Sequence, residues 1–347
     1  MLPYLLVLFL VMSWIFVEDK ALNRRAIWVP ACILIIFASI RDYTIGTDTP
    51  TYTKDFRLGV QPEYYEFNPN VEFGHESLIY LLLKMGVTEY YWFFFVTSIM
   101  VIVPIFFTIR KYSVDYKLSI YIYITFAFYT FYFNTLRQGI AISICLLGIK
   151  YILEKSFIKY FLIVFVASLF HVSAWIMLLM YFLVHLKVSF FVKIIGSFLA
   201  SIIGSSIVVS YMASSNVRYE KYNEAAENAG GYYLFLFYVV IAIFIYIFGK
   251  SLRFKSKEYN IFEQIYLYGI ALVFPIILLG SNPSGPQRIF YYFGISVIFL
   301  LPYIFNQFNS KVPKNIFIIF ALIYFILVTQ KLYEIYPYIL NPLFELI

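Results

Sequence analysis

The chain reads YYWFFFVTSIMVIVPIFFTI from Tyr90 to Ile109, a run of 20 residues without a charge. A helix of about 20 apolar residues crosses the roughly 30 Å hydrocarbon core of a bilayer. Similar runs recur along the chain, in which 62% of the 347 residues are hydrophobic and only 13% are charged. Soluble domains carry roughly 25% charged residues. The sequence therefore predicts an all-α polytopic membrane protein that forms one integral membrane domain over residues 1–347.

We predict twelve spans, and one alternative reduces the count to ten. In that alternative 157–170 and 172–186 form a re-entrant hairpin, which leaves the sidedness of the other spans unchanged. The apolar stretch Ser77–Gly86 is too short to span and is predicted to lie as an interfacial helix in a long outer loop over 41–89. A second outer loop covers 212–231. The predicted spans are 2–17, 26–40, 90–109, 117–134, 138–154, 157–170, 172–186, 190–211, 232–249, 260–280, 288–305 and 314–331.

The basic residues predict the orientation. Loops that face the cytoplasm carry an excess of Lys and Arg. With the N-terminus outside, 17 of the 26 Lys and Arg residues fall in or beside inner loops. We therefore expect both termini on the outer side. The net charge of +7 is concentrated in these short loops, so no nucleic-acid partner is expected.

With this orientation, polar residues from distant parts of the chain fall on the outer face or just beneath it. Polar and ionisable residues at membrane depth are costly and typical of functional sites. Only the fold can bring together residues so far apart in sequence, and an outward-facing active site is the pattern they predict. The set comprises Arg41, Asp42, Asp48, Glu72, His75, Glu76, Arg137, Gln138, His171 and Arg288.

Two of these arginines suggest an anion site. Arg137 stands between two spans, where it either clamps phosphate oxygens with its bidentate fork or extends to the lipid headgroups. Arg288 follows Pro286, which is placed to begin a helix. A helix N-terminus with an added positive charge binds anions, and an ordinary helix cap is the alternative.

Three residues are candidates for proton transfer. His171 lies between two apolar runs, where it acts either as a base with an ordinary pKa near 6.5 or as a packing residue. Asp48 stands in Gly46-Thr47-Asp48-Thr49-Pro50, which reads as a turn that the Asp side chain stabilises. Glu72 opens the segment Glu72-Phe-Gly-His-Glu76, whose spacing fits no metal motif. We predict no metal and no cofactor, since no nucleotide-binding motif is present either.

The motifs around these residues resemble the EpsG family of bacterial exopolysaccharide proteins, which is related to Wzy-type polymerases. The resemblance rests on Arg41 to Phe56 with its Gly-Thr-Asp motif, on Glu72-Phe-Gly74, and on Asn134 to Ala141. Phe170-His171 and Arg288 to Tyr292 also fit, so that residues 26–295 are covered. The chain departs from the pattern where Thr49 and Pro50 follow Asp48, since an aromatic residue is expected there.

The resemblance implies a membrane glycosyltransferase of the bacterial cytoplasmic membrane with a GT-C-like helical bundle. Such an enzyme joins polyprenyl-diphosphate-linked repeat units on the outer face, in exopolysaccharide, capsule or O-antigen synthesis. The implied partners are the lipid-linked oligosaccharide, the bilayer, and a flippase and chain-length regulator of the same pathway.

We assign roles on this basis. Arg41, Arg137 and Arg288 are expected to bind the diphosphate, with Asp42 and Gln138 in support. Asp48, Glu72 or His171 is expected to take the proton of the attacking sugar hydroxyl.

Two other functions remain open from the sequence. A transporter of lipid-linked glycan would carry polar residues through the membrane midplane, whereas the set here lies on one side. A ligase that transfers finished glycan cannot be separated from a polymerase by sequence.

Overall fold

The uncharged run from Tyr90 forms α6 (Tyr90–Tyr112), a helix of 23 residues in the computed structural model of the chain. The structure describes residues 1–25, 27–215, 232–278, 286–331 and 334–344. α6 packs against α2 (Trp28–Ser39) and α9 (Leu136–Leu147). Its two basic residues, Arg110 and Lys111, stand in the last turn, beyond the apolar stretch.

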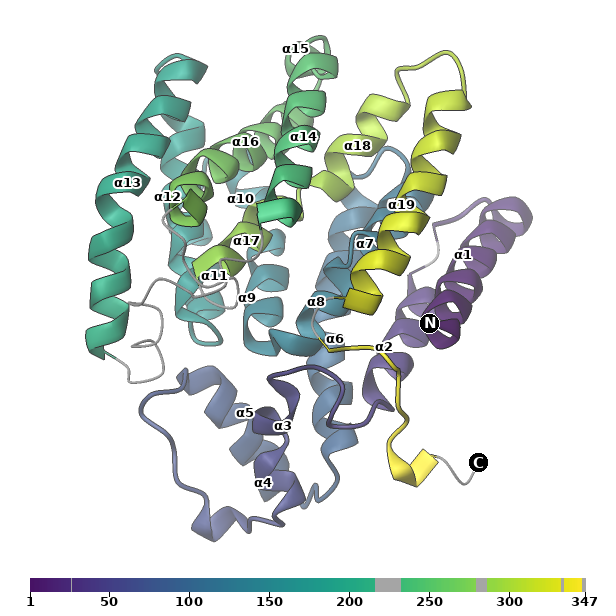
Figure 1. The fold of residues 1–347 in the computed structure, drawn as a ribbon, viewed down its shortest axis with the longest axis vertical. Coiled ribbons are helices and arrows are strands. Elements are labelled where there is room, and N and C mark those ends of the chain that lie inside the picture. Colours follow the sequence, from purple (N-terminus) through teal and green to yellow (C-terminus); the bar gives the residue numbers. More distant parts are fainter. Residues whose placement is uncertain (26, 216–231, 279–285, 332–333, 345–347) are drawn as a thin grey trace.

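The helices form a bundle with a smaller lobe at one end (Figure 1). The bundle helices are α1 (Leu2–Leu22), α7 (Tyr116–Thr125), α8 (Phe128–Asn134), α10 (Ile149–Leu153), α11 (Phe157–Ser168), α12 (Ile176–His185), α13 (Phe190–Ser215), α14 (Tyr232–Phe248), α15 (Leu252–Lys255), α16 (Lys257–Leu278), α17 (Tyr291–Gly294), α18 (Val297–Phe305) and α19 (Val312–Lys331). The short turns η2 (Val172–Trp175) and η4 (Pro286–Phe290) precede α12 and α17.

The bundle has the helices of a membrane-embedded protein, as the sequence predicts. Four described segments are long and apolar enough to cross a membrane, and one bent pair adds a fifth. The count of twelve spans is not confirmed, because most of the remaining apolar helices have only 10–17 described residues. The four segments are Tyr90–Tyr112, Leu136–Leu153, Lys257–Ile277 and Val312–Lys331.

Two expected spans are broken helices. The run 117–134 divides into α7 and α8 at Ala127, whose φ of 61° is left-handed and cannot continue a right-handed helix. The run 288–305 divides into η4 with α17 and then α18, with a bend of 45°. The first run gives no sign of its break, whereas Gly294 and Ser296 stand at the break of the second. Their effect is to bring the ends of α8 and η4 near the lobe.

The lobe comprises residues 41–89, the predicted first outer loop. It contains α3 (Thr49–Tyr52), α4 (Lys54–Arg57), η1 (Pro62–Tyr64) and α5 (Phe73–Lys84), and it lies below the bundle in Figure 1. The predicted short helix over 77–86 overlaps α5, which begins earlier, at Phe73, and ends at Lys84. α5 meets the turn after α11 at Gly74, whose N–H donates to the Leu169 carbonyl at 2.7 Å. A Cβ on Gly74 would lie 2.7 Å from that oxygen, so only glycine permits this approach.

The C-terminal segment runs back along the start of the lobe. Asp42 N donates to the Ile339 carbonyl at 2.9 Å, and Asn341 N donates to the Ile40 carbonyl at 2.8 Å. Gly46 N donates to the Glu334 carbonyl at 3.2 Å. These backbone bonds fix the entrance to the lobe. The second predicted loop, 212–231, lies outside the described residues from 216 onward.

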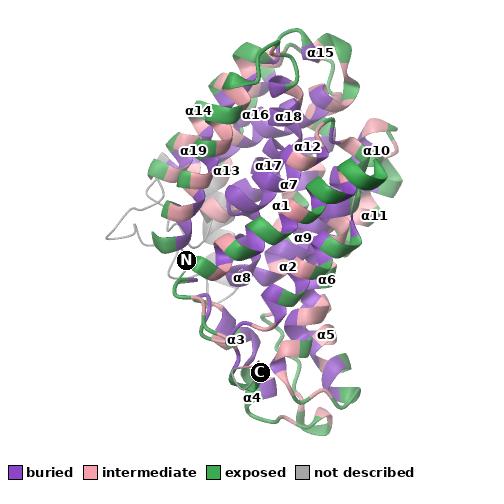
Figure 2. Ribbon diagram, turned by 90° about the vertical axis from the view of Figure 1, so that its right-hand side faces the viewer, coloured by how far each residue is buried: buried purple, intermediate pink, exposed green. Residues whose placement is uncertain are grey.

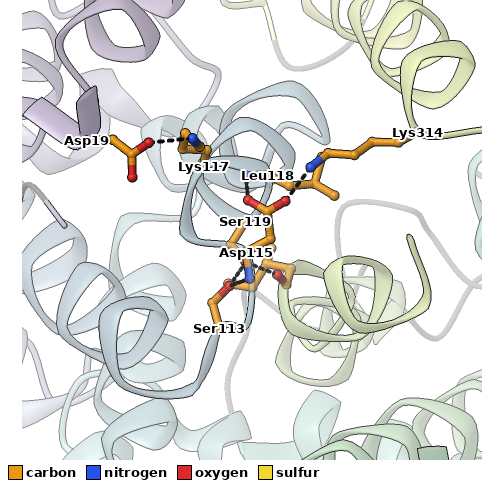
Figure 3. A network of polar contacts seen from close by, with 8 residues as sticks. Asp19, Ser113, Asp115, Lys117, Leu118, Ser119 and Lys314 are labelled. Carbon is orange, nitrogen blue, oxygen red and sulfur yellow. Dashed lines mark hydrogen bonds and ion pairs between the residues drawn. The ribbon is translucent and has the colours of Figure 1, made fainter. Parts of the chain in front are cut away.

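The opposite end of the bundle carries the basic turns. Figure 3 shows Lys117 paired with Asp19 at 2.7 Å and Lys314 paired with Asp115. Asp115 also caps α7 by accepting from Leu118 N at 3.1 Å. These contacts tie the ends of α1, α7 and α19 together. The basic turns beside these contacts therefore lie at the same end of the bundle, in agreement with their predicted common side. The orientation of that end in the membrane stays a prediction.

Buried residues fill the middle of the bundle. Figure 2 shows them along α7, α16, α17 and α18, with exposed residues on α14 and α15. Aromatic rings make much of this core, as in the stacked Phe131 and Tyr291, whose centroids are 3.7 Å apart. That pair joins α8 to α17 and holds the segment with Arg288 against the α8–α9 turn.

Candidate functional site

The Gly-Thr-Asp turn of the lobe sits on the junction of α8 and α9. The Asn134 side-chain oxygen accepts from Thr47 Oγ1 at 2.8 Å and from the backbone N–H of Asp48 at 3.1 Å. Gly46 has a φ of 101°, and a Cβ there would come within 2.8 Å of Thr49 Oγ1. The turn thus needs glycine both for its backbone angle and for its close contact. The turn thereby holds Asp48 at the junction of α8 and α9, where its carboxylate meets Arg288.

Two ion pairs form at this place between residues far apart in sequence. Arg288 Nη1 lies 3.0 Å from Asp48 Oδ2, with side chains 17% and 39% exposed. Arg137 Nη1 pairs with Glu72 Oε2, and these side chains are only 15% and 13% exposed. Gln138 Nε2 donates to the backbone carbonyl of Arg288 at 3.0 Å, so it contacts the segment that carries that arginine. The fold therefore brings together Asp48, Glu72, Arg137, Gln138 and Arg288.

Tyr52 stands between the two pairs; it belongs to the motif from Arg41 to Phe56, but no role was predicted for it. The Arg137 guanidinium lies 5.9 Å from the centre of its ring. Burial raises the pKa of the Tyr52 hydroxyl, and Arg137 acts in the opposite direction. The charges of Asp48 and Arg288 also act on this hydroxyl. One sequence signal could have found it, because positions 48 and 52 share a helix face at the spacing i, i+4.

His171 lies beside the Glu72 pair, in the turn between α11 and η2. The backbone N–H of Val172 donates to Glu72 Oε1 at 3.2 Å. His171 Nδ1 accepts from Ser173 N at 3.2 Å and lies 2.7 Å from Ser173 Oγ. Ser173 Oγ in turn lies 3.1 Å from the Tyr292 hydroxyl, so that this chain reaches α17.

The state of His171 follows from these contacts. A backbone N–H can only donate, so Nδ1 accepts and the neutral ring carries its proton on Nε2. Burial lowers the pKa of the imidazole to about 4, although the Glu72 carboxylate acts in the opposite direction. The guanidinium groups of Arg137 and Arg288 reinforce the lowering. His171 is thus a neutral hydrogen-bond donor at physiological pH, and its role as a base stays a prediction.

The structure places Arg41 and Asp42 away from the ion pairs. Arg41 is 1% exposed, and its guanidinium lies 3.8 Å from the ring centre of Phe94 and 4.5 Å from that of Phe133. Asp42 accepts from Thr44 N at 2.9 Å, which closes a local turn. The Arg41 guanidinium is thus enclosed by aromatic rings and takes no part in the two ion pairs, and the roles of Arg41 and Asp42 in diphosphate binding stay predictions.

A helix begins at Pro286, as the sequence predicts. η4 (Pro286–Phe290) continues directly into α17, and the 45° bend to α18 comes only after Gly294. Arg288 lies in the first turn of this short helix and adds a full positive charge there, while anion binding stays a prediction. The preceding loop, 281–285, lies outside the described residues.

Chemically, the site offers two guanidinium groups, each held by a carboxylate, at the end of a membrane-embedded bundle. Guanidinium forks bind phosphate oxygens, and carboxylates accept protons. Within the described ranges, no group of three or more His, Cys, Asp or Glu residues is arranged to hold a metal ion.

A family model supplies the comparison with known proteins. The EpsG family model matches residues 25–340, nearly the whole chain. The match includes both ion pairs and the turn that carries His171. Among curated proteins and among solved structures, no significant match was found.

Proposed function

The chain belongs to the EpsG family, and we propose that it is a polysaccharide polymerase. In this proposal it joins polyprenyl-diphosphate-linked oligosaccharide units at the outer face of the bacterial cytoplasmic membrane. The observation that carries the proposal is the convergence of the Asp48–Arg288 and Glu72–Arg137 pairs at one end of the bundle. Membrane-embedded helices suit a donor whose lipid stays in the bilayer. The family supports a role in exopolysaccharide synthesis.

We propose that the donor diphosphate binds by exchange of ion-pair partners. Its oxygens match the guanidinium fork as well as a carboxylate does and carry more charge. Binding to Arg288 would replace its single contact to Asp48, and binding to Arg137 would loosen its contact to Glu72. Donor binding thereby frees a carboxylate next to the anomeric carbon. The site prepares its base only when the donor is present.

Among the candidate bases, the contacts favour Asp48. Both oxygens of Glu72 are in use, one by Arg137 and one by Val172 N. Asp48 uses one oxygen for Arg288, and its side chain is three times as exposed as that of Glu72. His171 has Nδ1 occupied and its proton on Nε2. We therefore assign Asp48 as the base and Glu72 as the residue that positions Arg137.

The proposed step balances in atoms and charge. The acceptor hydroxyl oxygen forms a bond to the anomeric carbon while the bond from that carbon to the diphosphate oxygen breaks. The hydroxyl proton passes to Asp48, and the polyprenyl diphosphate leaves with the bonding electron pair. Arg137 and Arg288 stabilise the charge that develops on the leaving group. No cofactor takes part in this step.

The test is elongation by the purified protein. The chain in lipid nanodiscs receives one polyprenyl-diphosphate-linked repeat unit, and the products are separated by size and mass. We expect a ladder, with one polyprenyl diphosphate released for each glycosidic bond. Asp48→Asn protein, purified in the same way, controls for contaminating enzymes. Movement of the donor across the bilayer without a new glycosidic bond would instead identify a transporter, and a single transfer to another acceptor would identify a ligase.

A further inference from the structure

A cavity of about 380 Å³ lies in the lobe and borders the ion pairs through Arg137. Segments of α3, α4, η1 and α5 enclose it, and Arg137 closes the side toward the bundle. Small-molecule sites commonly have volumes of about 300–1,000 Å³, so this one suits a single small unit rather than a long chain.

The lining of the cavity combines aromatic rings with carboxylates. Tyr52 and Tyr64 contribute rings, while Asp55, Glu66 and Glu76 contribute carboxylate groups. Carboxylates accept hydrogen bonds from hydroxyl and amino groups, and aromatic faces pack against C–H groups. A sugar ring presents both kinds of group, whereas an acyl chain presents only apolar surface.

One wall of the cavity is fixed by internal bonds. Glu76 is 6% exposed and accepts from the Tyr65 hydroxyl and from Asn68 N, both at 2.9 Å. The Tyr65 ring packs against Tyr80, with centroids 6.1 Å apart. This wall is therefore formed before any ligand arrives, which lowers the entropic cost of binding.

Two other lining groups are left for a ligand. The half-buried Asp55 carboxylate makes no hydrogen bond or ion pair with any residue that the structure describes. Burial, together with the charge of Glu76, raises the pKa of Asp55, which a hydrogen-bond donor from a ligand would offset. The Tyr64 side chain is 80% exposed and contacts no other ring in the described ranges. Asp55 and Tyr64 are thus the groups available to contact a bound molecule.

We propose that this cavity binds one saccharide unit of the acceptor glycan, with the Tyr64 ring against the sugar and Asp55 accepting from its hydroxyl or amino groups. Three carboxylates line the cavity against two cations, Lys54 and Arg137. Like charges repel, so an uncharged or amino sugar is favoured over a uronic acid. Arg137 borders both the cavity and the diphosphate site, which places the acceptor beside the donor. The acceptor role rests on the proposed function, while saccharide binding itself does not.

The test measures binding without turnover. The full chain in nanodiscs is titrated with free oligosaccharides by saturation-transfer NMR, using cellotriose as neutral probe, chitosan trimer as amino probe and trigalacturonate as acidic probe. We expect neutral or amino probes to bind and the acidic probe to bind at least about tenfold more weakly. Tyr64→Ala and Asp55→Asn should each weaken binding about tenfold, the loss of one charged hydrogen bond or its equivalent. Glu63→Gln is the matched control, since Glu63 is exposed beside Tyr64 but does not line the cavity.

The outcomes separate this inference from the proposed function. Preference for the acidic probe, absence of binding by all three probes, or binding that Tyr64→Ala and Asp55→Asn leave intact in folded protein overturns the saccharide site. The saccharide site is also overturned if Tyr64→Ala and Asp55→Asn elongate with the same half-saturating acceptor concentration as the wild type. The polymerase proposal stands in that case. If the wild type binds saccharide and the two variants bind it more weakly, but the wild type never elongates a glycan, the saccharide site is supported and the polymerase is refuted.

Discussion

Asp48→Asn separates catalysis from stability at the site. The Asp48 side chain is 39% exposed and makes one contact of 3.0 Å to Arg288. Arg288 itself is only 17% exposed, so the pair is half-exposed. Exposed ion pairs contribute about 0–1 kcal/mol and breaking a buried pair costs about 3–5 kcal/mol, while asparagine keeps an oxygen that can accept from the guanidinium. The free energy of unfolding should therefore fall by only about 1–2 kcal/mol. Loss of a general base costs roughly 10²–10⁴-fold in rate, or about 3–5 kcal/mol of activation free energy.

The assay compares initial rates of elongation with the thermal unfolding midpoint of the same preparation. Asp19→Asn is the matched control, because Asp19 is also 39% exposed and also holds one ion pair, to Lys117, at the other end of the bundle. We expect wild-type elongation in Asp19→Asn and at least a hundredfold loss, about the lower limit for a lost base, in Asp48→Asn. Elongation by folded Asp48→Asn at the wild-type rate would remove Asp48 as the base. An equal loss in Asp19→Asn would show that the effect is global.

Three further predictions concern neighbouring features. Glu72→Gln leaves the Arg137 guanidinium largely buried without its charge partner, so the free energy of unfolding should fall by about 3 kcal/mol; a melting midpoint equal to that of the wild type would show that the pair is not formed. The pKa of His171 in the folded protein is about 4, below the ordinary value of about 6.5, so between these values the unfolded chain binds a proton that the folded protein does not. The free energy of unfolding should therefore decrease as the pH falls from 6.5 toward 4, and His171→Gln should abolish that dependence. A pH midpoint of the elongation rate near 6.5 that His171→Gln removes would contradict the lowered pKa. In a background without the two native cysteines, a cysteine at Glu63 should react with an impermeant thiol reagent in intact spheroplasts and one at Lys255 should not, and the reverse pattern would invert the topology.

Much of the helical architecture could be predicted from the sequence, because apolar runs have only one way to cross a bilayer. The internal break of the run 117–134 could not be predicted. Ala127 adopts its left-handed angle where α7 gives way to α8, and alanine carries no sequence signal for that conformation. The number of spans likewise depends on where short apolar helices lie in depth, which composition leaves open.

The candidate site could be predicted as a group but not as pairs. Charge asymmetry between loops placed Asp48, Glu72, Arg137 and Arg288 on one side, and the structure brings these four together. Which carboxylate holds which arginine depends on contacts spanning 65 and 240 residues, and no local pattern encodes them. Arg41 shows the converse, because its motif matches the family although its guanidinium lies buried between aromatic rings.

The most direct measurement of the central claim is the affinity of the two arginines for a diphosphate. Farnesyl diphosphate and farnesyl monophosphate serve as probes in a calorimetric titration of the chain in nanodiscs. Arg137→Lys and Arg288→Lys should each weaken diphosphate binding about tenfold to a hundredfold, since each loses a charged bidentate contact. Arg253→Lys is the matched control, because Arg253 is similarly buried and paired with Glu263 elsewhere in the bundle. We expect tight diphosphate binding that only the two site variants lose; equal affinity in all four proteins, or no preference for diphosphate over monophosphate, would contradict the account.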